Sequence, residues 1–224
     1  MGREKNLFSL FFFQFFIRTF AGMNNVTWSE NVIVADADYI DKVAFDLTVN
    51  FERMIGRRIP QADMARWIEC VALDGGLRPA ADGRQPETVT QVVLLHRGEA
   101  MKNFRPGNYA ELDGRAFSGP LGEFLLSCVK VEDIVTTGQL FAESLQVVAN
   151  AAEVKRIIAI PDGEQYYNKV RDVLRQADPD KHTTVLAMQP MQPGAFRQEL
   201  LGYSLMAALG IRAEEINEAQ SPLS

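Results

Sequence analysis

The chain has 224 residues, of which 47% are apolar, so it can form one domain with a full hydrophobic core rather than a disordered chain. Its two cysteines, Cys70 and Cys128, have no second thiol near either in sequence, which excludes a disulfide framework and a zinc ribbon. The formal net charge of −6 excludes a general basic surface for nucleic-acid backbones, so any contact with RNA has to be local.

The first 22 residues form a segment that we treat apart from the domain. A positively charged start precedes an apolar run, Leu7 to Ile17, which holds six of the fourteen phenylalanines. This layout is typical of a secretory signal, which would export the protein, and the run is too short to span a membrane. The alternative is that translation starts at Met23. The unpaired cysteines favour that start and a cytoplasmic location, with no membrane contact for the main domain.

Downstream of this segment, short β-branched runs alternate with amphipathic stretches. Continuous apolar character over a few residues, as in Val32 to Ala35, is typical of a strand buried on both faces of a parallel sheet. Five such strands are predicted, at residues 32–36, 91–96, 124–129, 154–160 and 183–188.

Apolar residues that recur every three or four positions predict the intervening helices. Gly56 ends the first helix, Pro60 opens the second, and Thr136 or Thr137 caps the third. Glycines and prolines around a short alternating piece predict a hairpin-like insertion near residues 103–122. The predicted helices cover residues 39–55, 60–73, 137–149, 163–174 and 196–209, and a polar tail starts at Arg212.

This alternation predicts a single α/β domain over residues 23–224 with a three-layer, Rossmann-like arrangement. The sheet is expected to be mostly parallel and five-stranded, with helices on both faces joined by right-handed crossovers. The expected strand order is 3-2-1-4-5. It places residues 32–36 at the centre, between residues 91–96 and 154–160.

Acidic residues follow two of the predicted strands at their carboxyl ends. Asp36 and Asp38 come after the first strand, and Asp162 and Glu164 after the fourth. Ligands of open α/β sheets bind outside these ends, where the strand order reverses, so we expect the four carboxylates to converge in one crevice. Converging carboxylates repel one another unless a cation neutralises them, and their oxygens suit Mg²⁺ or Mn²⁺. Asp36 and Asp162 are the candidate metal ligands, and such a metal could orient water against a phosphodiester.

A structural explanation exists for the same residues. Asp36 and Asp162 each precede a predicted helix, where an aspartate commonly caps the first N–H groups. Capping explains the presence of Asp36 and of Asp162 when each is taken alone. It explains less readily why Asp36, Asp38 and Asp41 are so closely spaced. No glycine-rich phosphate loop follows any strand, so a dinucleotide or NTP site of the common kind is not expected.

The sequence resembles the PIN-like nuclease superfamily, in particular its NYN branch, over about residues 31–209. The segment Val34-Ala35-Asp36-Ala37-Asp38 is similar to that family's first strand running into an aspartate. Ile160-Pro161-Asp162-Gly163-Glu164 is similar to its later acidic turn, with Pro161 in place of a Ser/Gly pair and Glu164 in place of a second aspartate. The resemblance implies a PIN-like fold and divalent-metal-dependent RNA cleavage. The whole chain is also similar to an uncharacterised bacterial family of domain-of-unknown-function proteins.

Two functions of different class remain open. The first is a ribonuclease that uses Asp36, Asp38, Asp162 and Glu164 with Mg²⁺ or Mn²⁺, and RNA as its partner. The second is a catalytically inactive α/β module that binds a partner or forms a homo-oligomer, in which the acidic crevice is vestigial. Binding of Mn²⁺ by the purified protein is the observation that separates them most directly.

Removal of residues 1–22 is expected to leave the α/β domain intact. The chain beginning at Met23 should unfold at the same temperature as the full chain, because the α/β pattern is complete from Asn31 onward. Thermal unfolding of the two chains checks this. A loss of several kcal/mol in the shorter chain would mean that the phenylalanines fill a core groove, since each fully buried one contributes about 1.5–3 kcal/mol.

Overall fold

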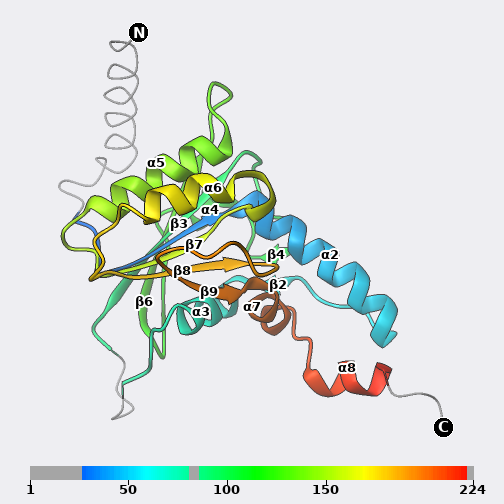
Figure 1. The fold of residues 1–224 in the computed structure, drawn as a ribbon. Helices are drawn as coiled ribbons and strands as arrows, with labels where there is room; N and C mark the ends of the chain where they lie inside the picture. Colours follow the sequence, from blue (N-terminus) through cyan, green and yellow to red (C-terminus); the bar gives the residue numbers. More distant parts are fainter. Residues whose placement is uncertain (1–26, 81–85, 221–224) are drawn as a thin grey trace.

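A seven-stranded sheet with β1 (Asn31–Asp36) at its centre organises the chain. The structure is a computed structural model that describes residues 27–80 and 86–220 (Figure 1). The side chains of Val32, Ile33, Val34 and Ala35 are completely buried, as the continuous apolar run predicts. β1 pairs in parallel with β3 (Val89–His96) on one side and with β7 (Arg156–Ile160) on the other. The predicted central position of residues 32–36 is therefore confirmed.

The sheet is mostly parallel, as predicted, but the expectation of a five-stranded sheet with the order 3-2-1-4-5 is wrong, because the sheet has seven strands. Its order is β5-β6-β3-β1-β7-β8-β9, and only β5 runs antiparallel to its neighbour. The five predicted strand segments occupy the interior, and a short strand is added at each edge. The remaining strands of the sheet are β5 (Ala116–Gly119), β6 (Gly122–Lys130), β8 (His182–Ala187) and β9 (Arg197–Leu200).

Neither edge strand was predicted as a separate strand, because the local sequence favoured another structure at each position. β5 belongs to the predicted hairpin-like insertion and forms an antiparallel hairpin with β6, in which Gly119 pairs with Gly122. Residues 197–200 fit the spacing of the predicted helix 196–209, yet they pair with β8, and α7 (Leu201–Ala208) starts only afterwards. Hydrogen bonding to an open sheet edge thus overrides the local helical pattern.

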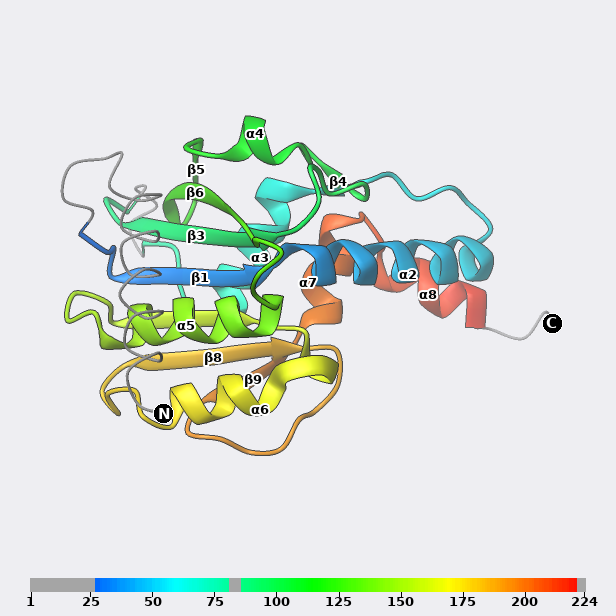
Figure 2. The ribbon, with the colours of Figure 1, turned by 90° about the horizontal axis from the view of Figure 1, so that it is seen from above.

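Helices cover both faces of the sheet (Figures 1 and 2). Ile33 and Ala35 of β1 share one core with α2 (Ala37–Ile55), α3 (Met64–Asp74) and α7. Val32 and Val34 point to the opposite face and share the second core with α5 (Thr137–Asn150) and α6 (Gly163–Leu174). The period of two along a strand therefore divides the apolar residues between two cores.

Capping residues set the helix ends, with one correction. Asp36 caps α2, whose other end is Gly56 with a φ of 70°, a left-handed value that glycine adopts readily. α3 starts at Met64 and not at Pro60, because Asp63 is its cap and residues 62–63 form β2 (Ala62–Asp63). β2 pairs with β4 (Phe104–Arg105), which ties the insertion, including the short helix α4 (Tyr109–Leu112), to the start of α3.

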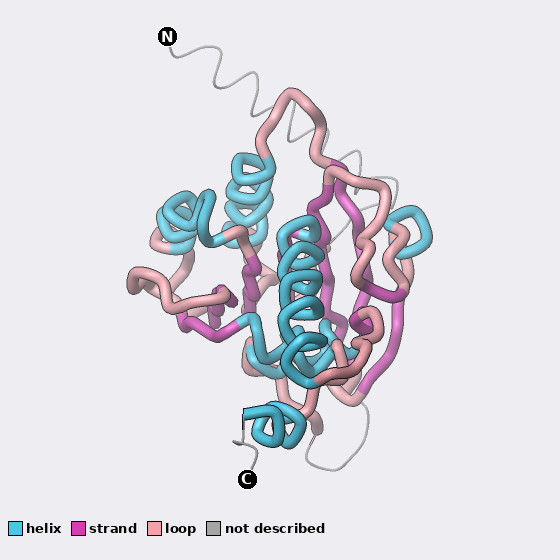
Figure 3. The backbone as a smooth tube through the Cα atoms, turned by 90° about the vertical axis from the view of Figure 1, so that its right-hand side faces the viewer, coloured by secondary structure: helices cyan, strands magenta, loops and turns pink. Residues whose placement is uncertain are grey.

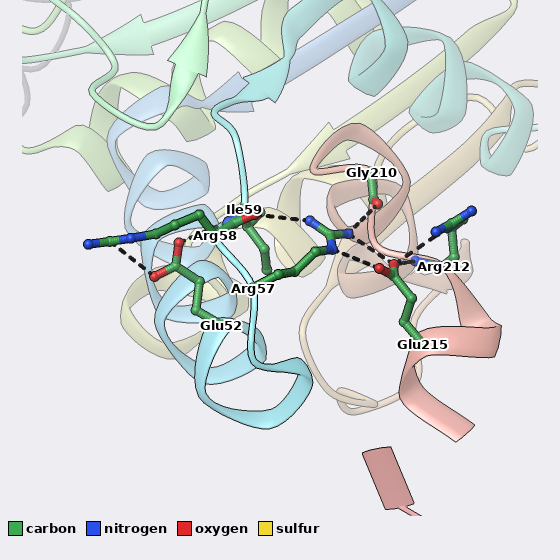
Figure 4. A network of polar contacts seen from close by, with 7 residues as sticks. All are labelled: Glu52, Arg57, Arg58, Ile59, Gly210, Arg212 and Glu215. Carbon is green, nitrogen blue, oxygen red and sulfur yellow. Dashed lines mark hydrogen bonds and ion pairs between the residues drawn. The ribbon is translucent and has the colours of Figure 1, made fainter. Parts of the chain in front are cut away.

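The C-terminal residues after Arg212 form a helix, α8 (Ala213–Gln220), where the sequence predicted only a polar tail. An arginine fork attaches it to the loop that follows α2 (Figure 4). Arg57 donates from Nε to Glu215 Oε1 at 2.7 Å and from Nη2 to Glu215 Oε2 at 2.9 Å. Arg57 also donates to the carbonyl oxygen of Gly210. These contacts explain why a polar segment is ordered against the domain.

The N-terminal segment that was considered as a signal lies outside the described residues. Within residues 27–80 and 86–220, no helix combines the length and the apolar character needed to cross a bilayer.

Trp67 of α3 provides a test of the first core. Its side chain is fully buried, and its ring meets Phe104 of β4 edge-on at a centroid distance of 5.6 Å. Trp67→Ala should lower the free energy of unfolding by about 3–5 kcal/mol, because a cavity remains. Leu73→Ala, on the same helix but 38% exposed, should lower it far less. Urea denaturation of both variants measures the difference, and equal losses would contradict this packing.

Candidate functional site at the strand carboxyl ends

A cavity of about 620 Å³ opens where β1, β3 and β7 end. It lies at the point where the strand order reverses. β1 leads to β3 through α2 and α3 on one face, whereas β7 is reached through α5 on the other face. Figure 3 views the molecule from this end, with α2 running toward the viewer. The first turns of α2, α5 and α6 contribute lining residues, so three helix N-termini meet at the cavity.

Asp36 is the most deeply placed carboxylate of the cavity, with 4% of its surface exposed. Its Oδ1 accepts a hydrogen bond from the Tyr39 N–H at 3.0 Å, and its Oδ2 accepts one from the Tyr166 hydroxyl at 2.5 Å. Burial raises the pKa of Asp36 above its usual value, while the hydrogen bonds from Tyr166 and Tyr39 act in the opposite direction. Asp36 is thus both a helix cap and a buried acid.

Tyr166 is held in place from the neighbouring helix α5. A Cβ atom added to Gly138 would lie 2.6 Å from the Tyr166 ring, so only glycine permits this approach. The Phe141 ring also packs against Tyr166, at a centroid distance of 5.5 Å. The backbone of Tyr166 has φ −143° and ψ 23°, which departs from helical values inside α6. The tyrosine hydroxyl is therefore aimed at Asp36 by packing on several sides.

Asp162 and Asp38 complete the set of carboxylates in the cavity. Asp162 Oδ1 accepts the N–H groups of Glu164 and Gln165, and its Oδ2 accepts the Gln165 side-chain amide at 2.5 Å. Asp38 Oδ2 accepts the Arg97 N–H at 2.8 Å, which joins the start of α2 to the end of β3. The structure thus supports capping by Asp36 and Asp162 and also brings both residues into one cavity with Asp38.

Glu164 is the sequence-predicted site residue that the cavity lining does not include. Its side chain is exposed in the first turn of α6. Burial raises the pKa of Tyr39 to about 12, and the charges of Asp162 and Glu164 act in the same direction. Asp41, the next acid on α2, accepts the N–H groups of Lys102 and Asn103 and so ties down the insertion. The local sequence places these residues near the site, and only the helix geometry decides which ones face the cavity.

Three basic side chains that the sequence prediction left out also line the cavity: Lys42, Arg97 and Lys169. Arg97 donates to the Thr137 hydroxyl at 3.2 Å and to the Val135 carbonyl at 2.7 Å, so its guanidinium is fixed beside the start of α5. Lys42 and Lys169 form no hydrogen bond or ion pair with the part of the chain that the structure describes. Lys42 could have been found from its position one helical turn after Asp38.

The carboxylates of the cavity have the chemistry of metal ligands, and their grouping bears on whether they could hold a cation. Their oxygens are of the type that Mg²⁺ and Mn²⁺ prefer. However, residues 27–80 and 86–220 contain no group of three or more Asp, Glu, His or Cys side chains placed to hold a metal ion. One oxygen of Asp36 is occupied by Tyr166, and both oxygens of Asp162 accept hydrogen bonds from the start of α6. A cation would have to share these oxygens with the hydrogen-bond donors.

Comparison with known proteins identifies the family of the chain. A family model described as a family of unknown function (DUF6621) matches residues 25–216. The chain belongs to the DUF6621 family. No curated protein and no solved structure matches this DUF6621 member. Because the family description assigns no activity, the function of the DUF6621 cavity has to be argued from its geometry.

The buried Asp36 predicts a specific pH dependence. A folded-state pKa above the unfolded value means that the folded protein binds the proton more tightly. The contribution of Asp36 to stability is therefore full below pH 3.8 and is lost as the pH rises through the raised folded-state pKa. Asp36→Asn cannot titrate and can still cap α2. Relative to wild type, this variant should gain unfolding free energy as the pH rises from about 4 to 7.

Urea denaturation of wild type and variant across this pH range measures the difference. Asp180→Asn, in an exposed turn, serves as the control and should show no such trend. A pH-independent difference between wild type and Asp36→Asn would contradict the raised pKa of Asp36.

Proposed function

We propose that this protein binds RNA, and that the cavity at the ends of β1, β3 and β7 holds a phosphodiester of the strand. The observation that carries this proposal is that Lys42, Arg97 and Lys169 face the same cavity as three aspartates at the sheet's reversal point. This position is where open α/β sheets bind their ligands. The unpaired cysteines support a cytoplasmic location for this activity.

Recognition of phosphate is assigned to the basic side chains and to α5. Arg97 presents a guanidinium that Thr137 and Val135 already orient, and a planar guanidinium matches two phosphate oxygens. Lys42 and Lys169 add two mobile ammonium groups. Thr137 and Gly138 are the first residues of α5 and line the cavity, and the N–H groups at a helix start favour anions.

The balance of charges in the cavity explains how an acidic protein could bind a polyanion locally. Three basic side chains line the cavity with three carboxylates, and one of these, Asp36, has a raised pKa because it is buried. Arg97 also forms an ion pair with the exposed Asp133 at 3.8 Å, so the two lysines supply the unpaired positive charge. The repulsion of a phosphate by the aspartates is thereby offset within the cavity. RNA binding through this site does not require the general basic surface that the composition excludes.

A second candidate function is divalent-metal-dependent cleavage of the RNA. The convergence of Asp36, Asp38 and Asp162 in one cavity favours it, as does the resemblance of both acidic segments to the NYN family. Against it stands the geometry, because no three Asp, Glu, His or Cys side chains of the described residues are placed to hold one metal ion. We therefore put binding first and treat the protein as catalytically inactive in the arrangement described.

Fluorescence anisotropy with a labelled single-stranded RNA tests the binding proposal. Wild-type protein should bind the RNA, and Lys42→Ala/Lys169→Ala should weaken binding at least tenfold, because both charges face the bound phosphate. Arg66→Ala/Arg175→Ala removes the same charge from exposed positions on α3 and at the end of α6, and should weaken binding much less. If both double variants weaken RNA binding equally, the RNA is held only by non-specific electrostatic attraction and not by the cavity.

Incubation of the same RNA with Mn²⁺ separates the two candidate functions. Intact RNA is expected with wild-type protein. Cleavage that needs Mn²⁺ and disappears in Asp36→Asn would instead establish the ribonuclease. Absence of both binding and cleavage would remove both proposals.

A further inference from the structure

The outer face of α2 forms a surface that continues from the cavity. Lys42 lines the cavity, and Phe45 follows it by one helical turn with 53% of its surface exposed. α2 runs on well past the ends of the strands, as Figures 1 and 2 show. A strand leaving the cavity on the side of Lys42 would therefore meet an exposed aromatic ring first.

The spacing of residues on α2 defines this outer face. Ile40, Val43 and Ala44 are buried against the sheet. Lys42, Phe45, Val49 and Arg53 recur at three or four residues on the opposite side, and we call these four residues the α2 outer face. Lys42, Phe45 and Arg53 are exposed, and Val49 is partly buried. The exposed Asp46 follows Lys42 by one helical turn, and Asp38 precedes Lys42 by one turn, so the face also carries negative charge.

We propose that the α2 outer face carries the single-stranded RNA onward from the cavity, with one base stacked on Phe45. This inference rests on the proposed function of the cavity and names the form of its ligand. Bases stack on exposed aromatic rings whatever their sequence, while basic side chains follow the backbone. Lys42 and Arg53 lie eleven residues apart, about 16 Å along a helix, so a ligand that contacts both has to be a strand rather than a single nucleotide.

Charge and position favour RNA over a protein as the occupant of this face. A protein-binding helix face usually presents a row of apolar residues, whereas here Phe45 lies between Lys42 and Arg53, beside the exposed Asp46, and only Val49 adds apolar surface. The face also begins at the cavity through Lys42, so one ligand can fill both.

Two probes of different length test the inference with the full chain. A fluorescent ten-residue oligouridylate should bind Phe45→Ala about tenfold more weakly than wild type, because a stacked base is lost. Uridine monophosphate, measured by calorimetry, should bind both proteins equally, because it fits within the cavity. Phe45→Trp should restore oligouridylate binding, since the indole also stacks. Tyr203→Ala, which removes a side chain 65% exposed on α7, is the matched control and should leave both affinities unchanged.

Several outcomes would overturn the inference. If wild type binds oligouridylate and Phe45→Ala binds it equally well, the α2 outer face takes no part while the proposed function stands. If Phe45→Ala weakens the binding of both probes equally, Phe45 stabilises the cavity itself and does not contact an RNA strand outside it. A change in oligomeric state of Phe45→Ala by sedimentation would show a self-association surface. Failure of wild type to bind either probe would instead reject the function of the cavity, and the inference with it.

Discussion

Burial of β1 on both faces is the constraint on which the rest of the structure depends. Its four central side chains are fully buried, so β1 requires a strand on each edge and a helix layer on each face. The chain meets this requirement by sending α2 and α3 to one face and α5 and α6 to the other. The reversal of strand order beside β1 follows, and with it a cavity at the carboxyl ends.

The contact between Asp36 and Tyr166 links a helix-capping residue to the lining of the cavity. Asp36 ends β1 and caps α2, which are structural tasks, yet its second oxygen faces the neighbouring helix α6 and receives the Tyr166 hydroxyl. Gly138 makes this contact feasible because α5 can then approach the tyrosine ring. The same hydrogen bond that satisfies a buried acid uses one of the two lone pairs of that oxygen. Phosphate binding is placed before hydrolysis because three basic side chains line the cavity, while no three metal-ligating side chains of the described residues are grouped around one point.

The distribution of charge gives the cavity its chemical character. An excess of carboxylates alone would require a cation, whereas Lys42, Arg97 and Lys169 supply positive charge from three different elements. Arg97 is held by its hydrogen bonds to Thr137 of α5 and to Val135 in the loop before α5. Lys42 and Lys169 are available to bind a ligand. Such a combination suits a ligand that carries negative charge on one part and hydrogen-bond donors on another, as a nucleotide does.

The sequence by itself determined the α/β class, the central place of residues 32–36 and the capping positions at Asp36 and Asp162, because these depend on local periodicity and on side chains adjacent in the chain. It left the cap of α5 open between Thr136 and Thr137, and the structure selects Thr136. The edge strand at Arg197–Leu200 was decided by tertiary structure, since hydrogen bonds to β8 outweigh a helical spacing that the same residues satisfy. Tertiary structure also decided which residues line the cavity. Packing sets the rotation of α2 and α6 about their axes, and so decides which side chains of these helices face the cavity. The approach of Lys42, Lys169 and Tyr166 to the cavity could therefore not be predicted from the spacing of the acidic residues. The same holds for the outward position of Glu164.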